Sequence, residues 1–160
     1  MAIPEPLLSI PELPTKVSEL ARLAVADMQK AKADGCAFGL AHAHWKDPGK
    51  PLCVCPAGAV MRRGVTDDKS AGFCWFDSRT QNLLFVIFHL AFGSFNAAFL
   101  TCYRALNRVS EVNQFATCWG ELTLLGRNSN RQFPADPEKN FDQHCADMLQ
   151  IAEVCERYGQ

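Results

Sequence analysis

The chain has 160 residues, a length that fits one domain of about 100–200 residues. Apolar residues make up 48% of the sequence and charged residues 21%, which excludes wholesale disorder. With 16 Lys and Arg against 17 Asp and Glu, the net charge is −1. A near-neutral chain lacks the basic face that displaces counterions from phosphates, so we expect no DNA partner.

Eight cysteines are many for this length, yet their share lies below that of a disulfide-stapled scaffold. Residues 1–6 carry neither the basic nor the continuous apolar segment of a secretory signal. We therefore expect a cytoplasmic protein with reduced thiols. Free cysteine behaves as a small apolar residue, and the helical pattern predicts four in the core: Cys102, Cys118, Cys145 and Cys155.

Four prolines fall within residues 1–14 and disfavour a helix, so the sequence predicts an extended arm followed by a single domain over residues 15–160. Leu7, Leu8 and Leu13 are too apolar for a freely solvated tail. Two interpretations stay open. The arm packs on its own domain, or it lies across a second copy of the chain in a homo-oligomer.

Helical periodicity runs from about Lys16 to Asp34, with Thr15 as the predicted N-cap. The period is lost over residues 36–55, where a turn and a short apolar run predict a small β-hairpin or an irregular loop. Pro56 then fits the first position of a short helix.

The chain turns helical again at Ser78, the predicted N-cap, and continues to about residue 107. Gly93 interrupts the pattern, and we expect two helices rather than one. Residues 83–100 carry no charged side chain, but their polar residues favour buried core helices over a membrane span. Alternating steps of three and four define a phenylalanine stripe: Phe85, Phe88, Phe92, Phe95 and Phe99. A second face of Leu84, Ile87 and Ala91 has the same spacing, so we expect the first part of this segment to be buried nearly all round.

A further helix fits residues 110–125, and Asp136 with Pro137 predicts the start of a last helix that ends before Gly159. Taken together, the patterns predict a mainly α, single-domain helical bundle of about five to six helices, with the small insertion near residues 36–55.

Potential metal ligands are densest at His42, His44, Cys53 and Cys55. Zinc binds four nitrogen or sulfur ligands, and alternate residues of an extended segment point to one side, so each pair could converge on one ion. Structural zinc sites more often separate their cysteines by two residues. We therefore expect no cofactor, and a zinc site in this segment is the alternative.

Cys55 is also a candidate nucleophile, because it precedes Pro56 and is the predicted N-cap of the short helix. A helix N-terminus stabilises a thiolate, which would lower the pKa of Cys55. Catalysis would also require a base, and His42, His44 and His144 are the candidates. The alternative is a packed cysteine at a tight turn.

Candidate binding residues are a group of aromatic side chains and a short basic patch. The aromatic candidates are Trp45, Trp75 and Phe76, and the basic patch is Arg62 with Arg63. Residues 127–131 form a second basic patch, and for both patches a solvated surface is the simpler interpretation. His89 lies in an apolar helix, where a lone histidine is more often a core or interface residue than a ligand.

Trp45, the turn at Pro48 and the segment VCPAGAVM at residues 54–61 form a recognisable pattern. The pattern resembles one in small uncharacterised proteins of bacteriophages and prophages, where a Trp, a turn and a C-x-V-C-L-A-G-A-V-M block precede a helix with L-x-A-L-x-x-x-R-x-G. Residues 83–93 are similar to that helix, although Leu52 replaces the first cysteine and Ala91 replaces the arginine. The resemblance implies a protein made during phage infection or from a prophage.

The sequence contains no glycine-rich phosphate loop, GxSxG elbow or HExxH motif. This shifts the interpretation from enzyme toward binding protein. We expect an accessory protein that binds a host protein, for example one used in defence. The alternative is a zinc- or thiol-dependent enzyme that uses residues 42–55.

Overall fold

The computed structural model describes residues 3–40, 43–94, 97–106 and 109–160. Within these residues the chain is mainly α-helical with a small sheet, which confirms the predicted fold class. The helices are α1 (Val17–Ala33), α2 (Pro56–Met61), η1 (Phe73–Trp75, a 3-10 turn), α3 (Ser78–Phe92), α4 (Ala97–Leu106), α5 (Val109–Arg127) and α6 (Phe141–Arg157), and the strands are β1 (Ala37–Phe38), β2 (His44–Trp45) and β3 (Cys53–Val54).

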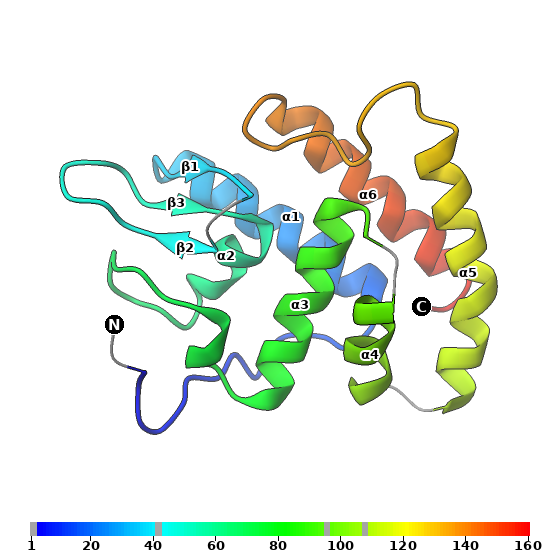
Figure 1. Ribbon diagram of the computed structural model, residues 1–160, viewed down its shortest axis with the longest axis horizontal. Helices are drawn as coiled ribbons and strands as arrows, with labels where there is room; N and C mark the ends of the chain where they lie inside the picture. Colours follow the sequence, from blue (N-terminus) through cyan, green and yellow to red (C-terminus); the bar gives the residue numbers. More distant parts are fainter. Residues whose placement is uncertain (1–2, 41–42, 95–96, 107–108) are drawn as a thin grey trace.

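Helix α1 packs against α2, α3 and α6, so it holds together the two ends of the molecule. Figure 1 shows the small sheet and α2 at one end and α4 with α5 at the other, with α3 between them. Among the described residues, no helix is long and apolar enough to cross a membrane.

The sheet has the strand order β1-β3-β2, with β1 parallel and β2 antiparallel to β3. Strands β2 and β3 form the hairpin that the sequence predicted as one alternative, and β1 extends it by one strand. His44 pairs with Val54, and Trp45 pairs with Cys53. Because paired residues point to the same face and successive residues to opposite faces, this register decides where the potential ligands lie.

The predicted break after α3 is confirmed at Gly93. This residue takes the left-handed conformation, with φ 68° and ψ 23°, and its backbone N–H reaches the carbonyls of the last turn. The N-cap is Asp77 rather than Ser78, because the Asp77 carboxylate accepts from the Thr80 N–H at 2.9 Å. Likewise Lys16, not Thr15, precedes α1.

The predicted start of the last helix at Asp136 is wrong. Helix α6 begins at Phe141, and the side chain of Asn140 caps it by accepting from the Gln143 N–H at 3.2 Å. Asp136 instead accepts from the Glu138 N–H at 2.9 Å and stabilises a preceding turn. Both residues are good caps, and the one farther along the chain begins the helix.

The predicted burial of α3 nearly all round is wrong on its phenylalanine face. Phe85 and Phe88 are half-buried, and Phe92 is 39% exposed. Phe99 in α4 is buried, and Phe95 lies outside the described residues. The opposite face of α3 enters the core through its aliphatic side chains: Leu83, Leu84, Ile87 and Leu90.

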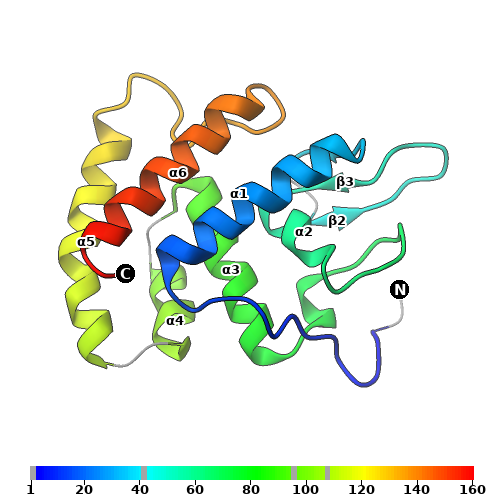
Figure 2. The same ribbon diagram turned by 180° about the vertical axis from the view of Figure 1, so that it is seen from behind.

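The N-terminal arm packs along its own domain, and Figure 2 shows it running past α3 to α1. Leu8 forms a bridge with Phe76, and its N–H donates to the Trp75 carbonyl at 2.8 Å. The Ile10 N–H donates to Thr80 Oγ1 at 3.2 Å, and both Ile10 and Leu13 are buried. These contacts place Leu8, Ile10 and Leu13 against the arm's own domain, whereas Leu7 stays exposed.

We expect Ile10→Ala to lower the free energy of unfolding by about 2 kcal/mol, because it removes a buried side chain from the core. The mass in solution should not change. Urea unfolding and light scattering measure the two effects. The matched control is Leu7→Ala, since Leu7 is exposed and its loss should cost less than about 0.5 kcal/mol. A change of oligomeric mass in Ile10→Ala would instead favour an arm shared between copies.

Candidate functional site

The sheet places two of the potential zinc ligands, His44 and Cys53, on opposite faces. The His44 ring lies on the face of Val54, whereas the Cys53 thiol lies on the face of Trp45. His42 lies outside the described residues. Among the residues that the structure describes, no group of three or more His, Cys, Asp or Glu side chains is placed to hold a metal ion.

His44 and His144 are buried, neutral histidines. The Nδ1 of His44 donates to the Lys69 carbonyl at 2.7 Å, and the Nδ1 of His144 donates to the Ala135 carbonyl at 2.5 Å. The Nε2 atoms of both rings are buried without a hydrogen-bond partner among the described residues. Burial lowers the pKa of each ring and outweighs the carbonyl contact, which acts in the opposite direction.

Acid should therefore destabilise the fold through these two histidines. The unfolded chain takes up protons near a pKa of about 6.5, while the folded rings resist protonation to lower pH. Their contribution is complete above about pH 6.5 and declines as the pH falls below it. We expect a lower urea midpoint at about pH 5.5 than at about pH 7.5, and a weaker pH dependence in His144→Gln. Equal midpoints in the wild-type protein would contradict this prediction.

Cys55 is the N-cap of α2, as predicted, and its Sγ accepts from the Gly58 N–H at 3.3 Å. The expected fall of its pKa is wrong. Burial raises the pKa of Cys55 to about 11 and outweighs the lowering by the N–H groups of the first turn. Of the candidate bases that the structure describes, His44 and His144 hydrogen-bond to backbone carbonyls, and neither hydrogen-bonds to Cys55. Cys53 is also a poor thiolate, because burial raises its pKa.

Alkylation should consequently spare Cys55. We expect iodoacetamide at about neutral pH to label the exposed Cys74 first and Cys55 far later, because the thiolate is the reacting form. Mass spectrometry over a time course measures the order, and the denatured protein provides the reference rates. Labelling of Cys55 ahead of Cys74 would restore Cys55 as a reactive thiol.

The arginines of the basic patch are held in intramolecular ion pairs. Arg63 contacts the Asp27 carboxylate through two nitrogens, at 2.6 and 2.8 Å, and Arg62 contacts Asp34 at 2.9 Å. In the second patch, Arg131 contacts the buried carboxylate of Asp147 at 2.6 and 2.7 Å. These pairs tie elements of the fold together.

Of the three aromatic candidates, one lies at the surface and two lie in the core. Trp45 is partly exposed, and its indole N–H donates to Asp47 at 2.9 Å. Trp75 and Phe76 are both buried and belong to the core beneath the arm. Of the three, only Trp45 can contact a partner without a change in the fold.

A different aromatic surface, which we name the phenylalanine row, lies along α3 and the preceding turn. It comprises Phe73, Phe85, Phe88 and Phe92. The Phe73 and Phe85 ring centroids are 4.7 Å apart, those of Phe73 and Phe88 are 6.0 Å apart, and those of Phe88 and Phe92 are 4.6 Å apart. The row is therefore continuous, and it is partly open to solvent along its length.

His89 lies beside the phenylalanine row, with its ring centroid 5.7 Å from that of Phe88. Burial lowers the pKa of His89, so the ring is neutral near pH 7. The phenylalanine row and the His89 ring beside it are therefore uncharged near pH 7. Sequence reasoning assigned both the phenylalanine face and the aliphatic face of α3 to the core, because both have the helical period.

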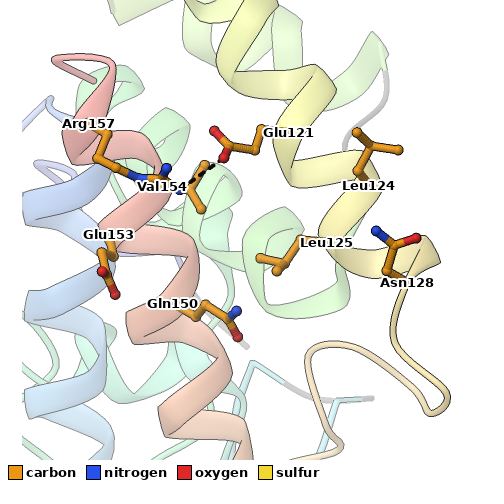
Figure 3. A pocket seen from close by; sticks show the side chains of 8 residues that line it. All are labelled: Glu121, Leu124, Leu125, Asn128, Gln150, Glu153, Val154 and Arg157. Atoms are coloured by element: carbon orange, nitrogen blue, oxygen red, sulfur yellow. Dashed lines mark hydrogen bonds and ion pairs between the residues drawn. The ribbon is translucent and has the colours of Figure 1, made fainter.

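A second open feature is the groove between α5 and α6, with a volume of about 370 Å³. Figure 3 shows Leu125 directed from α5 toward α6, and the ion pair of Glu121 with Arg157, 3.0 Å long, at one end of the groove. Leu124 on the rim is 55% exposed. The lining mixes apolar and polar groups, and neither a reactive centre nor a row of like charges is present among these side chains.

Comparisons of the chain with protein-family models, with curated proteins and with solved structures give no match.

Proposed function

We propose that the protein is a phage- or prophage-encoded accessory protein that acts without catalysis by binding a host protein. The phage setting rests on the resemblance of residues 45–61 and 83–93 to small phage proteins. Its place of action would be the cytoplasm of the infected or lysogenic bacterium, and proteins of a bacterial defence system are candidate partners.

The observation that carries the binding proposal is the phenylalanine row. Aromatic side chains are enriched in the centres of protein interfaces, where they bury a large area at a small cost in conformational entropy. The row presents several rings on one rigid helix, without a charge that binding would have to desolvate. The arginines of the basic patch, by contrast, already have carboxylate partners, which favours an apolar surface over an electrostatic one.

The alternative is a zinc- or thiol-dependent enzyme that uses residues 42–55. It has less support. His44 and Cys53 lie on opposite faces of the sheet, and burial disfavours the Cys55 thiolate. A binding protein requires neither a metal nor a thiolate, so it is the simpler account of the same geometry.

The test is affinity capture from a bacterial lysate, followed by direct binding of the purified partner to wild-type and variant proteins. Phe92→Glu places a charge at the exposed end of the row and should weaken binding at least about tenfold, as expected at an interface centre. The matched control is Leu124→Glu on α5, which changes another exposed apolar residue away from the row. Equal affinity of all three proteins would exclude the row as the binding surface.

A further inference from the structure

Two buried thiols face each other between α5 and α6. The Sγ atoms of Cys118 and Cys155 share a hydrogen bond and lie 3.6 Å apart. Both side chains are buried, and all eight cysteines of the chain are free in the structure. The sequence predicted both in the core, but their contact depends on how two separate helices pack.

We propose that Cys118 and Cys155 form an intramolecular disulfide when the protein meets a hydroperoxide, and that this bond fixes α5 to α6. A disulfide has a sulfur–sulfur distance of about 2.05 Å, so the two atoms must approach by roughly 1.5 Å. Rotation of the cysteine side chains about their Cα–Cβ bonds supplies movement of this kind. A small oxidant is required, since the thiols lie beneath the surface.

The chemistry balances with hydrogen peroxide as the oxidant. The hydrogen bond with Cys118 and burial raise the pKa of Cys155, so Cys155 keeps its proton during the first step. In that step the Cys118 sulfur attacks one peroxide oxygen, the O–O bond breaks, and the departing hydroxide takes up the thiol proton of Cys118 to become water; the product is a sulfenic acid. Cys155 then attacks that sulfur, the S–O bond breaks, and the Cys155 proton leaves with the hydroxide as a second water. Two thiols are oxidised and one peroxide is reduced to two waters.

The bond would add a covalent link to a contact that packing and a surface ion pair already support. Glu121 and Arg157 link the same two helices at 3.0 Å, but such exposed pairs contribute little. Val154, beside Cys155 in the chain, lines the groove between α5 and α6. Oxidation would therefore fix the width of this groove.

The experiment treats the full chain with hydrogen peroxide and maps its peptides without reduction. Trypsin releases Cys118 within residues 109–127 and Cys155 within residues 140–157, a peptide that also contains Cys145. We expect a cross-link between these two peptides, lost on reduction and retained in Cys145→Ala. Because the bond joins residues 37 apart, the melting temperature should rise by roughly 10 °C.

The variants Cys118→Ala and Cys155→Ala should show neither the cross-link nor the rise in melting temperature. Both cysteines remaining free while the exposed Cys74 is oxidised would overturn the proposal, as would a cross-link through Cys145. Oxidation of Cys118 to sulfinic acid without a cross-link would also overturn it. Mapping of the wild-type protein decides these outcomes even if an alanine variant fails to fold.

Discussion

Gly58→Ala is expected to abolish stable folding, or to lower the free energy of unfolding by roughly 4 kcal/mol or more. A Cβ atom at this position would lie 1.4 Å from the carbonyl oxygen of Ala43 and 2.5 Å from its carbonyl carbon. That carbonyl also accepts the Cys55 N–H at 3.1 Å, so it cannot move away without loss of a hydrogen bond at the start of α2. The clash involves backbone on both sides, and no side-chain rotation relieves it.

The control is Gly120→Ala. Gly120 also lies in a helix, but a Cβ there meets nothing within 4 Å. Alanine should stabilise that helix by about 0.5–1 kcal/mol, because it restricts the unfolded chain and favours the helical backbone. Urea unfolding followed by circular dichroism compares the two variants with the wild type. A Gly58→Ala protein with the wild-type midpoint would show that the loop at Ala43 does not pack against α2.

Local sequence signals predicted the structure correctly where a single residue determines the backbone conformation. Gly93 is an example, because its left-handed conformation ends α3 and glycine adopts it without strain. The end of the chain shows the limit of such signals. Asp136 and Asn140 are both competent caps, and the choice between them depends on which residues α6 buries against α1.

The sequence could not predict which face of α3 is more deeply buried. Its phenylalanine and aliphatic faces share one helical period, so periodicity alone does not say which face enters the core. The packing of α1, α2 and α6 against α3 selects the aliphatic face, with Leu84 and Ile87 fully buried. The phenylalanine row is therefore a consequence of tertiary packing.

The pKa of Cys55 depends on tertiary packing in a similar way. The position of Cys55 at a helix N-terminus was predicted correctly, but its burial by distant parts of the chain reverses the effect on its pKa. The ion pair of Arg63 with Asp27 could not be predicted either, because Asp27 lies 36 residues earlier in the sequence. Pairs of this kind are set by packing and have no local signature.

Asp147→Ala is expected to lower the free energy of unfolding by about 3–4 kcal/mol, because it removes charge-assisted hydrogen bonds and leaves a buried donor unpaired. The Asp147 carboxylate is only 1% exposed. It accepts two hydrogen bonds from Arg131, one from the Ala135 N–H at 2.9 Å and one from Gln143 at 2.9 Å. Together these bonds attach the loop before α6 to the helix itself.

The pH dependence of this loss distinguishes a charged anchor from simple packing. Burial raises the pKa of Asp147, but the hydrogen bonds from Arg131, Ala135 and Gln143 outweigh it and hold the pKa below its ordinary value. The carboxylate therefore stabilises the fold fully above about pH 4, and its contribution is lost as the pH falls below that value. The difference in unfolding free energy between wild type and Asp147→Ala should shrink in acid.

Glu153→Ala is the control, since Glu153 is exposed on the same helix and its loss should cost less than about 0.5 kcal/mol. Asp147→Asn should recover little, because its amide would place a donor against the guanidinium of Arg131, and full recovery in that variant would contradict the role of the charge.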